Sequence, residues 1–459
     1  MRCTFLVGIF LAYSISLTAQ NQGTGLLFDD AGYMSVPKKP RLMRGDYSYL
    51  PKVSSLKTYA PFPGNQTNLN TSPAWATAYS AKTILYAINN RLSDTREISE
   101  NSFAPSFTFY MIKEEGDTEC NQGAYLHKAL KSLKLDGSVK YLDFQYFCPS
   151  TISNQVIDQA KANKITDYSR IFDDTDTKDY KIKAVKKAIY NQLPVVIGMY
   201  APPSFRSTKE FWQPREKFSK DFEKQAMCVV GYDDTKYGGA FEVLNSWGRN
   251  WGNEGYMWIP YDTFIEFVKY AYEVYEEKDP LNTLDMGGEV VINLEKGGKM
   301  QAQLAADEGY YKVLQPYPTG TGIQIIIENQ QTAYAYVIGT DLTYNWWQLF
   351  PLPDSFVSPL LTYPSNHVAL PDEDTFITLE DPPGKDYLCI IYSKEELPIE
   401  EIVEQLTSST GDVMSRIRAV FGSKIVDYTN FDFDQSQVLF KGFSKGKSVL
   451  PVVIEIDHI

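Results

Sequence analysis

The sequence is poor in cysteine and histidine. Its 459 residues include five cysteines and three histidines, His127, His367 and His458. No cysteine has the spacing of zinc ligands, so we expect neither a metal site nor another cofactor. His127 falls off the apolar face of its predicted helix, and we expect it to be a solvated surface residue.

Long hydrophobic runs and an excess of positive charge are also lacking. After residue 20 no stretch is long and apolar enough to span a bilayer. The net charge of −13 is spread along the chain. It argues against nucleic acid and anionic membrane surfaces as partners, because both repel a negatively charged protein.

Residues 1–20 have the pattern of a secretory signal peptide. Arg2 is followed by an apolar run over residues 5–13 and by Ser-Leu-Thr-Ala-Gln. The apolar run is too short for a membrane anchor. We therefore expect cleavage after Ala19 or Gln20, and export to the periplasm, the outer membrane or the exterior.

An exported chain can form disulfides, and four cysteines remain after the predicted cleavage. Cys120 and Cys148 both flank predicted loops and are the candidate pair. Cys228 and Cys389 lie in apolar, strand-like runs, where a buried free thiol is expected.

A chain of this length is expected to hold two domains. Residues 21–50 are irregular and predict an extended arm that packs onto the next domain and is short for an inhibitory pro-region. Helices precede strands over residues 51–278, which predicts an α+β domain of two segregated lobes with a cleft between them. Residues 279–305 contain two glycine pairs and predict a linker. Residues 306–459 alternate like strands and predict a β-sandwich-like domain with one or two helices.

The stretch from residue 65 to residue 90 predicts a polar loop that leads into a buried helix. Ser72 is a good N-cap and Pro73 suits the first helical position. The helix is rich in alanine and apolar nearly all round, which indicates burial. We expect the Ser72 hydroxyl oxygen to accept a hydrogen bond from the backbone N–H of Ala74 or Trp75.

Several motifs in order carry a family resemblance, and they extend over about residues 50–278. They are Asn65-Gln66 with Ala74-Trp75-Ala76, Cys120-Asn121-Gln122-Gly123, the run from Ala226 to Asp234, Asn245-Ser246-Trp247-Gly248, and Trp251-Gly252-Asn253-Glu254-Gly255-Tyr256. With these motifs the chain resembles the papain-like cysteine peptidases. The second half resembles, more loosely, a β-rich domain of unknown function found in bacterial envelope proteins.

The resemblance implies roles for four positions. The nucleophilic cysteine corresponds to Ser72 and the catalytic histidine to Gln225, whereas the oxyanion-hole glutamine and the orienting asparagine are retained as Gln66 and Asn245. A serine hydroxyl needs a general base within hydrogen-bond reach. A glutamine cannot accept a proton at a useful pH. The resemblance also implies that Cys120 lacks its usual partner, because that position is Leu69, which favours its pairing with Cys148.

These substitutions predict a catalytically inactive, papain-like protein of the bacterial cell envelope. It would bind a protein or peptide, or act as a structural subunit of an outer-membrane or other envelope complex. The alternative is an active hydrolase that uses Ser72 with an unconventional base, such as a carboxylate or a lysine. The loop over residues 199–222 is a candidate partner-binding surface, or is pinned to the body by its aromatic side chains: Phe205, Phe211, Trp212 and Phe218.

Overall fold

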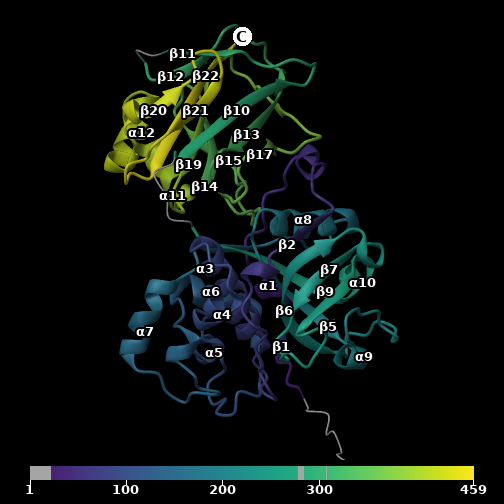
Figure 1. The fold of residues 1–459 in the computed structure, drawn as a ribbon. Coiled ribbons are helices and arrows are strands. Elements are labelled where there is room, and N and C mark those ends of the chain that lie inside the picture. Colours follow the sequence, from purple (N-terminus) through teal and green to yellow (C-terminus); the bar gives the residue numbers. More distant parts are fainter. Residues whose placement is uncertain (1–21, 278–283, 306–307) are drawn as a thin grey trace, which may run out of the picture.

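The computed structural model describes residues 22–277, 284–305 and 308–459. The predicted signal peptide lies outside the described residues. Figure 1 shows two bodies, with the helices α3 to α7 on one side of the lower body and a sheet on the other. The predicted two-lobed α+β domain followed by a strand-rich domain is confirmed.

The helical lobe is built around one buried helix. It runs without a break through α2 (Ser72–Ala74), the π-helical segment η3 (Trp75–Lys82) and α3 (Thr83–Asn89), and residues 71–85 are all buried. The alanine-rich pattern therefore predicted both the helix and its burial. The lobe also contains α4 (Thr95–Glu100), α5 (Pro105–Ile112), β3 (Ala124–Tyr125), α6 (Leu126–Leu135), η4 (Tyr141–Asp143), α7 (Asn154–Ala160) and η5 (Lys161–Asn163).

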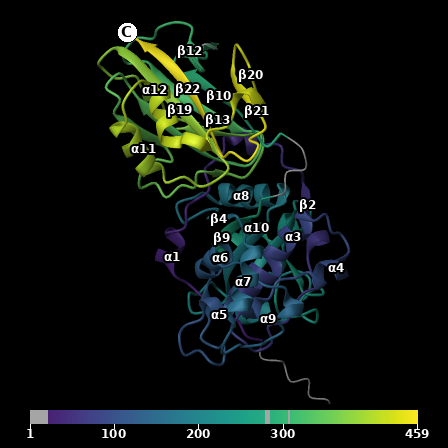
Figure 2. The same ribbon diagram turned by 90° about the vertical axis from the view of Figure 1, so that its left-hand side faces the viewer.

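The second lobe is an antiparallel sheet with strand order β4-β9-β5-β6-β7-β8, and β2 pairs with β6. All residues of β5 and β7 are buried, as are nine of the eleven in β6. The strands are β2 (Val53–Ser55), β4 (Asp167–Arg170), β5 (Val195–Ala201), β6 (Glu223–Asp233), β7 (Ala240–Leu244), β8 (Tyr256–Pro260) and β9 (Val268–Tyr275). They are accompanied by α8 (Lys178–Tyr190), α9 (Pro203–Ser207), η6 (Lys236–Gly238) and α10 (Tyr261–Phe267), and α8 lies where this lobe meets the upper body (Figures 1 and 2).

The C-terminal domain packs two sheets and a layer of helices. One sheet has the order β17-β13-β10-β21-β20 and the other β11-β12-β22-β19-β14-β15. The first contains β10 (Met286–Leu294), β13 (Gly322–Asn329), β17 (Asn366–Leu370), β18 (Ile377–Thr378), β20 (Phe431–Phe433) and β21 (Val438–Gly442). The second contains β11 (Ala302–Ala305), β12 (Tyr310–Val313), β14 (Ala333–Thr340), β15 (Trp346–Phe350), β16 (Leu360–Leu361), β19 (Gly384–Ser393) and β22 (Val449–His458).

Alternation along β14 explains the layering, because successive strand residues point to opposite faces. Ala335 and Val337 belong to the core between the sheets. Tyr334, Tyr336 and Ile338 pack instead against α11 (Ile399–Ser408) and α12 (Val413–Phe421), which cover the outer face of that sheet (Figure 2). Two short turns, η7 (Gly422–Lys424) and η8 (Tyr428–Asn430), lead to the last strands.

The linker predicted over residues 279–305 is wrong from residue 286 onward. Met286–Leu294 is β10, a strand inside the first sheet that pairs with β13 and β21. Gly288 is needed there for close packing, since a Cβ would lie 2.5 Å from the Glu328 carbonyl oxygen. The glycine pair therefore marks a crowded strand and not a flexible join.

The N-terminal arm contacts both domains. It contains β1 (Leu26–Leu27), α1 (Asp30–Met34) and η1 (Arg44–Tyr47), and η2 (Lys57–Tyr59) follows β2. Midway, Lys39 is buried and forms an ion pair with Glu273 of β9. Glu273 also accepts hydrogen bonds from Thr362 (2.7 Å) and Tyr363 of the C-terminal domain. Burial lowers the pKa of Lys39 to about 8, although Glu273 acts to raise it. The arm is thus clamped between the two domains.

Candidate active site

The structure brings the four family positions together at the junction of the lobes. Gln66 lies in the loop before the central helix, Ser72 begins that helix, Gln225 is on β6, and Asn245 directly follows β7. All four are buried. The site therefore forms because the helix N-terminus of one lobe packs against the strand edges of the other.

Gln225 occupies the histidine position and holds its neighbours through amide hydrogen bonds. Its Nε2 donates to Asn245 Oδ1 at 2.8 Å and to Gln66 Oε1 at 3.3 Å. Gln66 Oε1 also accepts from the Ser246 hydroxyl at 2.6 Å. Asn245 thus orients the side chain at this position, but that side chain has no basic nitrogen.

Ser72 does not cap the helix as predicted. Its Oγ accepts a hydrogen bond from the backbone N–H of Ala226 at 3.2 Å. The N–H groups of Ala74 and Trp75 instead donate to the Thr71 carbonyl oxygen, at 3.1 and 3.3 Å, and Thr71 is the cap residue. The serine is displaced from capping because a strand of the other lobe presents a donor. In the part of the chain that the structure describes, no side chain accepts the Ser72 proton.

A carbonyl of the arm lies between the two donors of the oxyanion hole. The Thr24 carbonyl oxygen accepts from Gln66 Nε2 and from the backbone N–H of Ser72, both at 3.1 Å. Two donors that converge on one oxygen at the nucleophile position are the arrangement that stabilises an oxyanion in acyl transfer. The two donors therefore converge as the family resemblance implies for an oxyanion hole, and a backbone carbonyl of this chain lies between them.

The rest of the arm segment over residues 22–27 follows the cleft. The Gly23 N–H donates to Thr67 O (2.9 Å), and the Gly23 carbonyl accepts from the indole N–H of Trp247 (2.8 Å). Further along, β1 pairs in parallel with β3, and the Ala124 N–H donates to Gly25 O at 2.9 Å. Sequence reasoning placed the arm on the domain surface and missed this path.

Two glycines allow this close approach. A Cβ at Gly23 would lie 2.0 Å from Leu69 O, and one at Gly25 would lie 2.1 Å from Asn70 O. Gly25 also has a φ of +92°, in the left-handed region that favours glycine. The Gly-Thr-Gly sequence was the available signal for a backbone that passes close to another.

Comparison with known proteins identifies both domains. Residues 74–274 match the model of the papain family of cysteine proteases, and residues 316–396 match a domain of unknown function (DUF4384). The chain contains a papain-family domain. The match includes Gln225 and Asn245 and begins just after Ser72.

Individual relatives of the papain-family domain are distant. An uncharacterised peptidase C1-like protein of Acanthamoeba polyphaga mimivirus is 27% identical over 196 residues, which are 40% of this chain and 61% of that protein. Cathepsin K of Gallus gallus is 27% identical over 136 residues, 29% of this chain and 39% of the relative. The chain thus spans less than two thirds of either relative.

Solved structures of cysteine proteases also align with this chain. Xylellain from Xylella fastidiosa has 22% identity and a TM-score of 0.46, with 56% of this chain and 97% of xylellain covered. The bromelain protease from Ananas comosus, in complex with the E64 inhibitor, has 17% identity and a TM-score of 0.40, with 50% and 100% covered.

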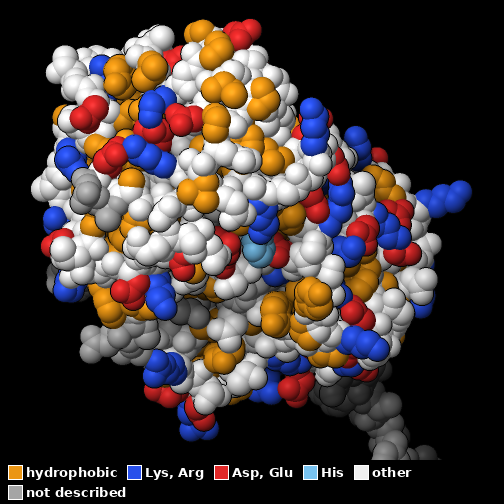
Figure 3. Space-filling model, turned by 90° about the horizontal axis from the view of Figure 1, so that it is seen from above, with side chains coloured by type: hydrophobic (Ala, Val, Ile, Leu, Met, Phe, Trp, Pro, Cys, Tyr) orange, Lys and Arg blue, Asp and Glu red, His pale blue; other side chains and the backbone are white. Residues whose placement is uncertain are grey.

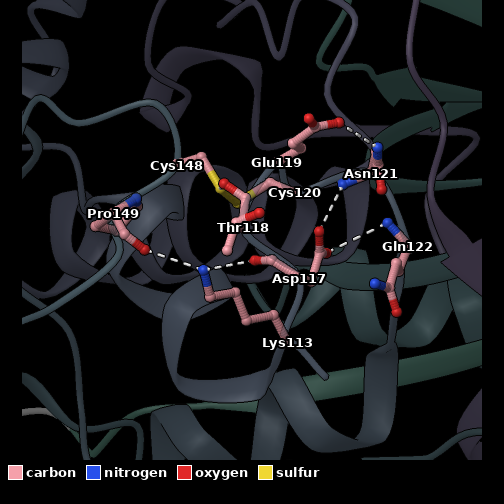
Figure 4. Close-up of a disulfide and its surroundings, with 9 residues drawn as sticks. All are labelled: Lys113, Asp117, Thr118, Glu119, Cys120, Asn121, Gln122, Cys148 and Pro149. Atoms are coloured by element: carbon pink, nitrogen blue, oxygen red, sulfur yellow. Dashed lines mark hydrogen bonds between the residues drawn. A yellow bond between two sulfur atoms is a disulfide. The ribbon is translucent and has the colours of Figure 1, made fainter. Parts of the chain in front are cut away.

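The predicted disulfide of the papain-family domain is confirmed. Cys120 and Cys148 are bonded, and Lys113 lies beside them, donating to the carbonyl oxygens of Asp117 (2.8 Å) and Pro149 (3.0 Å) (Figure 4). These bonds fix the segment before Cys148 to the helical lobe. Cys228 and Cys389 are free and buried, as expected, and burial raises the pKa of both thiols. Neither therefore supplies a thiolate nucleophile.

The aromatic loop of the papain-family domain mainly packs against the domain. Phe205 and Trp212 are fully buried and contact each other, and Phe205 also packs on Trp247. The partner-binding prediction is wrong for these two, because their rings fill the core below the loop. Phe211 stacks on Tyr237, with ring centroids 4.1 Å apart, and Phe218 is exposed.

In the described part of the chain, none of the three histidines forms a hydrogen bond with Gln225 or Ser72. His127 is beside Asp29, with 3.7 Å between His127 Nε2 and the carboxylate, and its side chain is only 18% exposed. The expectation of a solvated surface residue is therefore wrong, because the arm covers it. His367 is paired with Asp46, and His458 Nε2 lies 2.8 Å from Thr319 Oγ1.

Proposed function

We propose that this chain is a catalytically inactive papain-family protein of the bacterial cell envelope that binds peptide or protein without cleaving it. The observation that carries the proposal is Gln225, which takes the place of the base and is hydrogen-bonded to Asn245. A positioned general base typically contributes about 10²- to 10⁴-fold to the rate. Without one, the Ser72 hydroxyl stays protonated and is a poor nucleophile.

The geometry of the cleft supports peptide binding. Backbone groups of Gly23, Thr24 and Gly25 are held on both sides by the cleft walls, and the Thr24 carbonyl has two donors. These contacts are made to main chain, and the close walls admit only glycine at two of the three positions, so a partner peptide with a Gly-x-Gly sequence could use them after displacing the arm. The arm is then a tethered competitor for the same site.

A hydrolase that uses Ser72 remains the second candidate, because the oxyanion hole is intact. A fluorophosphonate probe distinguishes the two, since it labels serines activated by a base. Our proposal predicts no labelling of the native protein, and labelling that Ser72→Ala abolishes would establish the hydrolase.

Two features support an envelope location. They are the signal-peptide pattern of residues 1–20 and the Cys120–Cys148 disulfide, which suits an oxidising compartment. No helix in the described part of the chain is long and apolar enough to cross a membrane. Acidic and basic side chains are interspersed over the face seen in Figure 3, which fits a protein partner better than a polyanion.

The direct test is an assay of peptide and casein hydrolysis, combined with recovery of partners from solubilised envelopes. We expect the native protein and Ser72→Ala to show the same background rate. We also expect the native protein to co-purify with an envelope protein. Turnover that depends on Ser72 would refute inactivity, and recovery of free monomer alone would refute the role in an envelope complex.

A further inference from the structure

A small pocket lies beside the central helix, and its lining contains no residue of the arm. Its volume is about 140 Å³. The lining comes from the loop before the helix, the start of α5 and the segment before Cys148: Asn65, Gln66, Leu69, Thr71, Trp75, Pro105, Ser106, Tyr141, Gln145, Tyr146 and Phe147. Drug-sized ligands occupy about 300–1,000 Å³, so this pocket suits a single small ring.

The lining residues are all uncharged. An ionic group that entered the pocket would lose hydration and find no counter-ion, at a cost of several kcal/mol. The polar side chains are amides and hydroxyls, which can both donate and accept hydrogen bonds. The pocket therefore favours a neutral ligand whose own groups both donate and accept hydrogen bonds.

One of these polar groups lacks a partner. Thr71 is 3% exposed, and its Oγ1 makes no hydrogen bond among the described residues. That oxygen is itself buried, so a ligand in the pocket does not reach it, and the exposed side-chain amides of the lining are those of Asn65 and Gln145.

Aromatic rings form the wall and the rim. Trp75 is held in place by Tyr79, at 4.9 Å between ring centroids. Tyr146 and Phe147 are 61% and 73% exposed, although burial of a large aromatic side chain usually stabilises the folded protein. The segment that carries them ends at Cys148, which the disulfide and the Lys113 hydrogen bonds hold to the lobe (Figure 4). The two exposed rings thus stand on an anchored backbone, which lowers the entropy cost of binding.

We propose that this pocket binds a neutral saccharide, one ring of which enters between Trp75 and the rim formed by Tyr146 and Phe147. The aromatic rings cover the C–H faces of the sugar, and the amides of Asn65 and Gln145 bond its hydroxyl groups. The open rim leaves room for the adjoining sugar units. Gln66 and Leu69 line this pocket and also meet the arm in the peptide-binding cleft, so the two sites adjoin, but the proposal does not depend on the proposed function.

The test uses cellotriose, maltotriose and chitotriose as neutral probes and trigalacturonate as a charged control. Binding is followed by calorimetry and by tryptophan fluorescence. We expect at least one neutral trisaccharide to bind, with a Kd on the order of 1 mM or tighter. Tyr146→Ala/Phe147→Ala should weaken that Kd at least tenfold, and Gln145→Ala about fivefold. Leu142→Ala, exposed in the same segment but outside the lining, should leave it unchanged.

Four results would overturn the proposal. The first is that no neutral trisaccharide binds at about 10 mM, some tenfold above the expected Kd. The second is that trigalacturonate binds as well as the neutral probes. The third is binding that the rim variant, shown to be folded by circular dichroism, does not weaken. If an N-acetylglutaminamide peptide binds through the same residues and the sugars do not, the pocket is a peptide site and the proposal also fails.

Discussion

Substitution of Gly23 and Gly25 by alanine should release the arm from the cleft. Each new Cβ would lie near 2 Å from a backbone oxygen of the wall, and alanine at position 25 would also need a φ of +92°. The variant changes only the arm, so the cleft wall, including Gln66, stays intact. The prediction tests whether the cleft still recognises peptide main chain.

Residues 23–25 are held in the cleft by a small net free energy. Hydrogen bonds made by residues 23–25 contribute about 0.5–1.5 kcal/mol each, roughly 3–9 kcal/mol together. Ordering three backbone residues costs about 1–2 kcal/mol each, roughly 3–6 kcal/mol together. The balance is therefore a few kcal/mol, and two backbone clashes of this severity exceed it.

The assay measures fluorescence anisotropy of a labelled peptide with the sequence of residues 22–29. We expect no binding to the native protein, because its own arm fills the cleft, and saturable binding to Gly23→Ala/Gly25→Ala. Gly45→Ala is the matched control, since it lies in the same arm and its Cβ would meet nothing within 4 Å. Equal binding to the native protein and the variant, or an arm in the variant that resists protease as well as the native arm, would refute the reasoning.

Three further predictions concern stability. Lys39→Met leaves the Glu273 carboxylate buried without its cation and should lower the free energy of unfolding by about 3–5 kcal/mol in thermal melts. Adding Glu273→Gln should restore part of this loss. A loss below about 1 kcal/mol would contradict the clamp. Burial acts to raise the pKa of Asp173, but hydrogen bonds, led by the one from Lys38, lower it well below its ordinary value of 3.8. The ionised carboxylate therefore stabilises the folded state above about pH 3.8, and this stabilisation is lost as the pH falls below that value. Asp173→Asn should therefore flatten the fall in urea midpoint between about pH 5 and about pH 2, and an unchanged slope would exclude this role. Cys148→Ser opens a loop of 28 residues and should cost about 3–4 kcal/mol in urea unfolding, and an unchanged urea midpoint would contradict this.

Much of the fold could be predicted because its signals are periodic. The alternation of Tyr334, Tyr336 and Ile338 gave β14, and the apolar spacing of residues 399–406 gave α11. The central helix followed from its alanines and from Pro73 at the first turn. The β10 strand was missed because Gly287 and Gly288 usually mark a flexible segment, whereas here they allow tight packing between strands.

The site was predictable in its residues but not in its contacts. The family motifs placed Gln66, Ser72, Gln225 and Asn245, and the structure brings them together. The direction of the Ser72 hydroxyl depends on a donor of β6, more than 150 residues away along the chain, which no local rule reveals. The arm's path was missed for the same reason, since Thr24 meets its partners only after both lobes have folded.

Hydrolysis by the arm-released protein tests the central claim most directly, because an occupied cleft can no longer hide activity. We predict that Gly23→Ala/Gly25→Ala binds peptide and cleaves none above the rate of the same variant with Ser72→Ala. Turnover that disappears when Ser72 is replaced would show that the site is still an enzyme and would contradict the account.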